Sequence, residues 1–319
     1  MSFSGSVKDE LSRQVAQARH CQIAELAAIL GFCGSVKRQS DGQFIIKIFT
    51  ENVTVARKVF TLVQKTFNIV ACVSVRRNMN RQNVSYLVVI TNPPDVLRIL
   101  KATKRMREDG DVSVEERFVN PLIAGRICCR RAFLRGTFLC VGSMSNPGKA
   151  YHFEIVCSRP AAANQVCDLI RSFGMDAKVV PRKKTYVVYL KEGSQIVDIL
   201  NIMEAHIALM ELENIRILKE VRNSINRQVN CETANISKTV SAAVKQVKDI
   251  EYLRDTVGLE RLPPSLEEIA LVRLLHPEAT LKELGELLSP SVGKSGVNHR
   301  LRKISEITEK VRRKQGGAL

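Results

Sequence analysis

Two stretches of the sequence match each other: residues 24–35, AELAAILGFCGS, and residues 132–143, AFLRGTFLCVGS. The offset between them is constant at 108 residues. Each stretch is followed by a strand-like run and then by a run with helical periodicity, which makes a chance match less plausible. The strand-like runs are residues 44–48 and 151–156, and the helical runs are residues 53–67 and 161–173. The sequence therefore predicts an internal repeat.

Both repeats continue with two more strands and a helix. The strands are expected at residues 70–75, 84–90, 177–180 and 185–190, and the helices start at residues 95 and 195. Basic turns, Arg76-Arg77-Asn78 and Arg182-Lys183-Lys184, separate the strands at equivalent points. They could bind phosphates or keep an edge of the sheet soluble. Each half has the order helix, strand, helix, strand, strand, helix, with room for one additional strand.

The leading helix of each repeat places small residues four positions apart on one face. These residues are Ala24 and Ala28 in the first repeat and Ala132 and Gly136 in the second. Small side chains allow two helix backbones to approach closely. We therefore predict an α+β domain with pseudo-two-fold symmetry, in which these helices pair and the strands of both halves form one antiparallel, saddle-like platform. Two independent copies of an α+β module are the alternative.

The composition limits the class of protein. The chain has 319 residues, of which 45% are hydrophobic, enough for two or three domains with buried cores. The apolar stretch at residues 23–34 is too short for a membrane span and contains Glu25, and the N-terminus carries no secretion signal. We expect a cytoplasmic protein without a membrane partner. The formal charge of +17 favours a polyanion, with nucleic acid as the leading candidate.

The nine cysteines and five histidines show no pattern of a metal or catalytic site. The sequence has no Cys-x-x-Cys, and no histidine lies at a zinc-like spacing from a pair of cysteines. We expect the cysteines to be small buried hydrophobic residues in a reducing compartment. His20, His152 and His206 are expected to be packing or surface residues. We predict no cofactor, no bound metal and no catalytic residue.

Arginines surround the second leading helix, at positions 126, 130, 131 and 135. They could contact a DNA backbone or a protein partner. Equally, they could cap carbonyl groups and pair with acidic neighbours such as Glu25. We favour the structural role, because ion pairs are common at the edge of a packed helix interface.

The last hundred residues have the pattern of a helix-turn-helix. Capping boxes, Ser265 with Glu268 and Thr280 with Glu283, predict two helices, one ending near residue 275 and one over residues 281–288. A third helix is expected from about Ser295. In a helix-turn-helix such a helix contacts base edges in the major groove. An ordinary three-helix bundle with a solvated basic face is the alternative.

The expected third helix has an apolar and a polar face. Its apolar face carries Val297, Leu301, Ile304 and Thr308. The candidates for base contacts lie on or beside the polar face and are Ser295, Asn298, His299, Arg302 and Lys303. Residues 294–314 hold eight basic and two acidic side chains, a net charge of +6. The candidates for phosphate contacts are Lys294, Arg300, Lys310, Arg312, Arg313 and Lys314.

The two leading helices resemble those of the LAGLIDADG homing-endonuclease fold. Residues 134–142 are the better copy of its nine-residue signature, and residues 26–34 are the weaker. In that family a metal-binding carboxylate precedes the final glycine, and Mg²⁺ requires oxygen ligands. Here these degenerate metal positions hold Cys33 and Val141. The resemblance implies a retained scaffold and a lost nuclease, with residual metal-dependent endonuclease activity as the alternative.

The degenerate repeat followed by a helix-turn-helix resembles the WhiA family of bacterial transcription regulators. The resemblance covers nearly the whole chain and is carried by residues 2–4, 7–11, 131–136, 151–157, 186–191, 226–235 and 294–303. It implies binding of double-stranded promoter DNA by the C-terminal domain, without nuclease activity. It also implies a cytoplasmic, nucleoid-associated protein linked to sporulation, cell division and chromosome segregation.

These observations predict four segments. They are an N-terminal segment with the first repeat (1–112), the second repeat (113–213), a helical linker (214–262) and a helix-turn-helix domain (263–319). A further interpretation is compatible with DNA binding by the last domain. In it the repeat domain is a protein-interaction scaffold that docks another transcription regulator or RNA polymerase.

Overall fold

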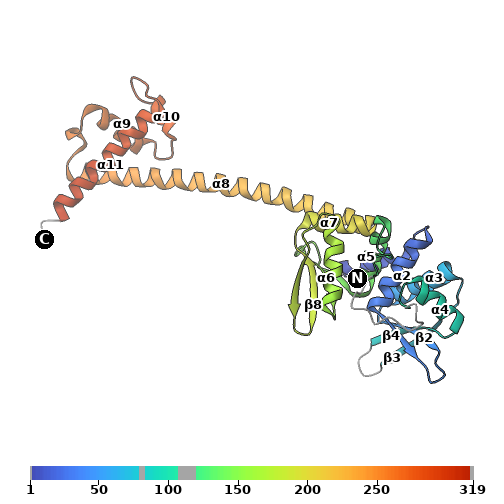
Figure 1. The fold of residues 1–319 in the computed structure, drawn as a ribbon. Helices are drawn as coiled ribbons and strands as arrows, with labels where there is room; N and C mark the ends of the chain where they lie inside the picture. The colour runs from blue at the N-terminus through green and yellow to red at the C-terminus, as the bar shows by residue number, and fades with distance from the viewer. Residues whose placement is uncertain (1, 79–82, 107–119, 317–319) are drawn as a thin grey trace. The chain divides into compact units, whose positions relative to one another are not determined.

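The computed structural model describes residues 2–78, 83–106 and 120–316, without the side chains of residues 78, 83 and 314–316. The chain forms two compact units (Figure 1): residues 1–220, here called the repeat unit, and residues 221–319, the C-terminal unit. Helix α8 (His206–Thr256) begins in the first and ends in the second. No helix in the described parts of the chain combines the length and the apolar character needed to cross a membrane.

The repeat unit contains every element that the sequence predicts. After α1 (Phe3–Arg13), the first repeat consists of α2 (Arg19–Phe32), β1 (Gly34–Arg38), β2 (Phe44–Thr50), α3 (Val53–Phe67), β3 (Cys72–Asn78), β4 (Asn83–Ile90) and α4 (Pro93–Ala102). The second repeat consists of α5 (Ile127–Val141), β5 (Gly142–Met144), β6 (Phe153–Cys157), α6 (Pro160–Arg171), β7 (Lys178–Arg182), β8 (Thr185–Leu190) and α7 (Gly193–Met203). The additional strand, β1 or β5, directly follows the leading helix.

Each repeat forms its own four-stranded antiparallel sheet, in the orders β1-β2-β4-β3 and β5-β6-β8-β7. Among the described residues no strand is hydrogen-bonded to the other sheet, so the predicted platform consists of two sheets rather than one. Helices cover one face of each sheet. In β6, for example, Phe153, Ile155 and Cys157 are buried while the residues between them are half-buried, because successive strand residues point to opposite faces.

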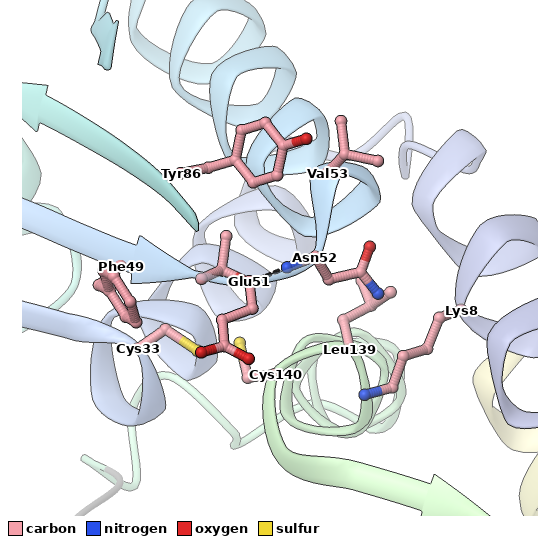
Figure 2. Close-up of a pocket in the computed structure, with 10 residues that line it drawn as sticks. Lys8, Cys33, Phe49, Glu51, Asn52, Val53, Tyr86, Leu139 and Cys140 are labelled. Atoms are coloured by element: carbon pink, nitrogen blue, oxygen red, sulfur yellow. Dashed lines mark hydrogen bonds between the residues drawn. The ribbon is translucent and has the colours of Figure 1, made fainter. Parts of the chain in front are cut away.

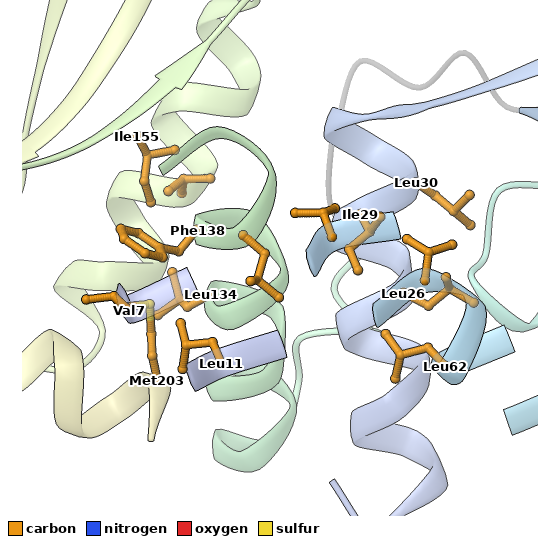
Figure 3. Close-up of a cluster of buried hydrophobic side chains, with 14 of the residues drawn as sticks. Val7, Leu11, Leu26, Ile29, Leu30, Leu62, Leu134, Phe138, Ile155 and Met203 are labelled. Atoms are coloured by element: carbon orange, nitrogen blue, oxygen red, sulfur yellow. The ribbon is translucent and has the colours of Figure 1, made fainter. Parts of the chain in front are cut away.

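One hydrophobic core spans both repeats (Figure 3). Helix α1 contributes Val7 and Leu11, which are fully buried in the same cluster as Leu134 of α5. Leu26 of α2 and Leu62 of α3 also belong to this cluster. Because residues of both repeats share one core, the repeats are not independent modules, and the predicted pairing is confirmed.

The leading helices α2 and α5 pack at close range. A Cβ atom at Gly136 of α5 would lie 2.6 Å from the carbonyl oxygen of Glu25 and 3.1 Å from Cβ of Ala28, both in α2. A carbon and an oxygen cannot approach to 2.6 Å without a shift of the backbone. The small residues Ala24, Ala28 and Ala132 are buried in the same interface. The close approach predicted from the spacing of small residues is therefore confirmed.

Beside this contact lies a group of buried charges. The Glu25 side chain is 0% exposed, and its Oε1 lies 2.9 Å from Nζ of Lys58 and 3.1 Å from Nε of Arg135. Nη1 of Arg135 lies 2.6 Å from Oε2 of Glu204, the residue that follows α7. Burial lowers the pKa of the Lys58 ammonium, and the Glu25 carboxylate opposes this effect. Two carboxylates thus balance two cations.

Arginines 130, 131 and 135 have structural contacts. Nε of Arg130 donates to the carbonyl of Ala124 at 3.0 Å. Arg131 donates to the carbonyls of Asn201 and Ile202 at 3.1 and 3.0 Å, near the end of α7. Together with the ion pairs of Arg135, these bonds confirm the structural role for three of the four arginines.

The C-terminal unit contains the end of α8, a short 3-10 helix (Leu259–Arg261), α9 (Pro264–Leu275), α10 (Leu281–Glu286) and α11 (Lys294–Gly316). The capping box of α10 is confirmed, with Thr280 and Glu283 exchanging two hydrogen bonds. The capping box at Ser265 was wrong. The N-cap is Pro263, two residues before Ser265, and Pro264 is the first helical residue, because proline has its backbone φ preset and lacks an N–H that needs a cap. The Glu268 carboxylate instead accepts a hydrogen bond from the Ser289 amide at 2.9 Å.

The first prediction tests the close approach of the two helices. Gly136→Ala adds one methyl group where it would meet the α2 backbone, so we expect it to lower the free energy of unfolding by about 1–3 kcal/mol. Chemical denaturation of the full chain measures this loss. Gly193→Ala is the control, because its Cβ would have neighbours no closer than 3.5 Å. Equal effects of the two substitutions would contradict the close packing.

The second prediction tests the buried charges. Glu25→Gln keeps the size of the side chain but leaves Lys58 and Arg135 with one carboxylate, and we expect a loss of about 3–5 kcal/mol in denaturant titrations. Asp9→Asn removes the ion pair with Arg13, whose side chain is 75% exposed, and should change stability by about 0–1 kcal/mol. If Glu25→Gln were as mild as Asp9→Asn, the ion pairs would not stabilise the interface.

Candidate nucleic-acid interface

Helices α10 and α11 and the turn between them form the helix-turn-helix. A Cβ atom at Gly285 in α10 would lie 2.0 Å from the carbonyl oxygen of Val292, so the turn folds directly against α10. The Val292 amide donates to the Gly285 carbonyl at 2.9 Å. Glycine is required at this position because any side chain would push the turn, and α11 with it, away from α10.

The inner face of α11 is the predicted apolar one. Val297, Leu301, Ile304 and Thr308 are all buried, with at most 1% of each residue exposed. The Thr308 hydroxyl donates to the carbonyl of Asp249 in α8 at 3.2 Å. These contacts fix the rotation of α11 about its own axis, which decides the side chains that face outward.

All candidates for base contacts lie on the exposed surface of α11; they are Ser295, Asn298, His299, Arg302 and Lys303. They extend over two and a half turns of one helix, a length that can follow the edges of several base pairs. Nε of Arg302 lies 3.4 Å from Glu306, one turn further along the same helix. Both side chains are more than half exposed, so this pair can exchange for a DNA partner with little loss.

The candidates for phosphate contacts fall into two groups. Lys294, Lys310 and Arg313 extend from exposed positions of α11. Arg300 lies 3.8 Å from the carboxylate of Glu268, and Arg312 lies 3.1 Å from that of Asp249. The Arg312 guanidinium also lies over the ring of Tyr252, 4.7 Å from its centre. The Lys314 side chain lies outside the described residues.

Arg273 of α9 holds the unit together and was missed by sequence analysis. It is 2% exposed and donates to Oε1 of Gln246 at 2.7 and 3.0 Å and to the Ala279 carbonyl at 2.6 Å. These bonds connect α9 to α8 and to the segment before α10. Burial lowers the pKa of the Arg273 guanidinium. An arginine within an apolar run was the available signal, since such a residue needs buried acceptors.

The degenerate metal positions lie at the C-terminal ends of α2 and α5. Cys33 lines a pocket of about 600 Å³ together with Lys8, Glu51 and Cys140 (Figure 2). Val141 is the last residue of α5 and packs against the core. Glu51 is the one carboxylate among the described residues that line the pocket. A lone carboxylate with thiols and an ammonium group does not fit a hard cation such as Mg²⁺.

The two predicted basic turns differ in structure. Arg76, Arg77 and Asn78 pair with β4 as the end of strand β3, so the turn predicted there was wrong, whereas Lys183 and Lys184 form the turn after β7. Arg76 and Arg77 are exposed on β3, whereas Arg182, Lys183 and Lys184 are exposed around the turn from β7 to β8. Lys183 has a φ of 56°, as hairpin turns often require. Exposed basic residues thus occur at equivalent points of the two sheets. They could bind phosphates or keep an edge of the sheet soluble, and both interpretations stay open.

His20 is a surface residue, as expected, but sequence analysis did not reveal the group of side chains around it. The side chains of His20, Cys21, Cys128 and Cys129 lie together, with ligand atoms within 4.8 Å of one another. Spacing along the chain did not show this group, because its two halves come from different helices. The cysteines are also not all buried, since Cys72, Cys128 and Cys231 are exposed.

Comparison with known proteins supports the same organisation. Three family models match consecutive parts of the chain: the WhiA N-terminal LAGLIDADG-like domain at residues 19–104, the WhiA LAGLIDADG-like domain at residues 130–222 and the WhiA C-terminal HTH domain at residues 225–308. The fold is similar to that of full-length WhiA from Thermatoga maritima, with a TM-score of 0.59, 24% identity and coverage of 97% of this chain and 99% of that chain. The predicted α+β class with a LAGLIDADG-like repeat and a helix-turn-helix is therefore confirmed.

Closer relatives in sequence are proteins named probable cell division protein WhiA. The protein from Lachnoclostridium phytofermentans is 54% identical over 98% of this chain and 100% of that protein. Its counterpart from Clostridium perfringens is 48% identical over 98% of this chain and 99% of that protein. With similarity at this level over almost the full length, the chain belongs to the WhiA family.

Proposed function

We propose that this protein is a sequence-specific DNA-binding transcription regulator without enzymatic activity. The observation that carries the proposal is the division of α11 into a fully buried face and an exposed face bearing the five candidates for base contacts. A helix held in this way by a second helix is the arrangement by which a helix-turn-helix enters the major groove. Asparagine suits adenine, and arginine or lysine suits guanine.

The charge on α11 supports the same proposal. Lys294 is exposed at the start of the helix, and Lys310 and Arg313 are exposed near its end, on either side of the base-contacting residues. Basic side chains at such flanking positions bind phosphates and set the register of the helix on the duplex. The relatives carry the name of a cell division protein, so we propose that promoters of cell-division genes are among the targets. Links to sporulation and chromosome segregation are proposed from family resemblance alone.

The repeat unit has a different role in this proposal. Its two degenerate metal positions offer a thiol and a valine, and neither supplies an oxygen ligand. The scaffold is nevertheless intact, with one core and paired helices. We propose that it docks another transcription regulator or RNA polymerase beside promoter DNA, and that the protein acts on the bacterial nucleoid in the cytoplasm.

The third prediction separates base contacts from phosphate contacts. A preferred duplex is first selected from random DNA with the full-length protein. We expect Asn298→Ala and Arg302→Ala to weaken binding to this duplex by about 1–3 kcal/mol, with little effect on a scrambled duplex. Lys310→Ala should weaken binding to both duplexes equally. It should also lower by about one the number of counterions released on binding, which determines the salt dependence of the affinity. Gel-shift titrations at several salt concentrations measure these values.

Two outcomes would count against the base-contacting role of α11. Either Asn298→Ala loses the same affinity for both duplexes, or selection yields no preferred sequence. Arg273→Ala would not serve as a test, because loss of its buried hydrogen bonds would disturb the fold of the unit.

The fourth prediction concerns the absence of nuclease activity. Plasmid and linear DNA incubated with the purified protein and Mg²⁺ or Mn²⁺ should stay uncut, as judged by agarose gels. A metal-dependent double-strand break that persists through further purification of the wild type would overturn the proposal.

A further inference from the structure

The N-terminal ends of the paired helices carry four soft donor groups. His20 and Cys21 are the second and third residues of α2, and Cys128 and Cys129 are the second and third residues of α5. The offset of 108 residues that relates the two repeats also relates His20 to Cys128 and Cys21 to Cys129. The four side chains are therefore two pairs placed together by the internal symmetry of the unit.

The distances within this group suit one small metal ion. Nδ1 of His20 lies 3.3 Å from Sγ of Cys21 and 3.3 Å from Sγ of Cys129, and all four ligand atoms lie within 4.8 Å of one another. In a tetrahedral zinc site the Zn–S distance is about 2.3 Å and the Zn–N distance about 2.0 Å, which separates sulfur from nitrogen by about 3.5 Å and two sulfurs by about 3.8 Å. The two nitrogen–sulfur distances given above, both 3.3 Å, are close to the first of these values.

The surroundings combine a dry interior with access from solvent. Cys21 and Cys129 are 5% and 4% exposed and pack with Ala24, Ala132 and Phe133, whereas His20 and Cys128 are exposed. An ion can therefore enter from the side of the exposed ligands. Without a metal, burial raises the pKa of the Cys21 thiol to about 12 and raises that of the Cys129 thiol. A zinc ion bound to such a thiol displaces its proton. Nitrogen and sulfur donors select zinc over the hard cations Mg²⁺ and Ca²⁺.

We propose that His20, Cys21, Cys128 and Cys129 bind one zinc ion, which joins the N-terminal ends of α2 and α5. On binding, the three thiols release their protons to solvent, and neutral His20 supplies its free ring nitrogen. All four positions of the tetrahedron are then filled by the protein, so the site is structural rather than catalytic. It acts as a cross-link between the two repeats.

The test uses the full chain, purified under reducing conditions with zinc and then desalted. Native mass spectrometry and metal analysis should find about one zinc per chain. Cobalt in its place should give the absorption of thiolate-bound, tetrahedral Co²⁺. Cys128→Ser and His20→Ala change exposed ligands and should leave the fold intact. Each variant should lose its zinc to a chelating indicator. The indicator concentration needed should be more than about 100-fold lower than that needed for the wild type.

The matched control is the double variant Cys72→Ser, Cys231→Ser, which removes two exposed cysteines elsewhere and should keep one zinc. A chelator should lower the thermal midpoint of the wild type and of this control, but not that of Cys128→Ser. Three results would overturn the proposal: no zinc retained by the wild type, zinc lost in the control, or a disulfide or an iron–sulfur cluster found at these cysteines instead.

Discussion

The close approach of α2 and α5 determines the rest of the repeat unit. Where Gly136 meets α2 there is no space for a single added carbon atom, so water is excluded from the interface. A buried Glu25 carboxylate without partners would destabilise the fold in such a place. Its partners come from different elements, Lys58 from α3 and Arg135 from α5, while Glu204 completes the charge balance from the end of α7. The close packing at Gly136 therefore requires a set of ion pairs, and these ion pairs hold α3, α5 and the end of α7 around α2.

The two ends of this helix pair have opposite chemistry. At the C-terminal ends, the positions that hold a carboxylate in nucleases of this fold hold Cys33 and Val141, and a hard cation has too few oxygen ligands. At the N-terminal ends, three thiols and one imidazole converge, a set of soft donors that suits zinc. In the proposed zinc site a structural metal would join the N-terminal ends, whereas the C-terminal ends offer no ligand set that suits a hard cation.

Patterns that recur along the chain predicted much of the fold. The same patterns did not predict contacts between residues that are distant in the sequence. The repeat and the small residues of its leading helices were found because they are regular in sequence. The partners of Glu25 and the group around His20 join residues of different elements, which spacing within one element cannot show. The offset of 108 residues, applied to His20 and Cys21, would have revealed the second group. The cap at Ser265 was wrong because Pro264 competes for the helix start.

Net charge in sequence also overstates the charge available to DNA. The excess of six over residues 294–314 includes Arg300 and Arg312, which lie against Glu268 and Asp249 within the C-terminal unit. Asp249 is almost fully buried, so removing Arg312 would leave a buried carboxylate without its cation, and this arginine therefore stabilises the position of α11. Some of the basic residues therefore hold the helix in place, whereas others, such as Lys294, Lys310 and Arg313, are exposed. One basic cluster thus contains residues that orient α11 through ion pairs with Glu268 and Asp249, and residues whose charge faces solvent and sets the electrostatic field around the helix.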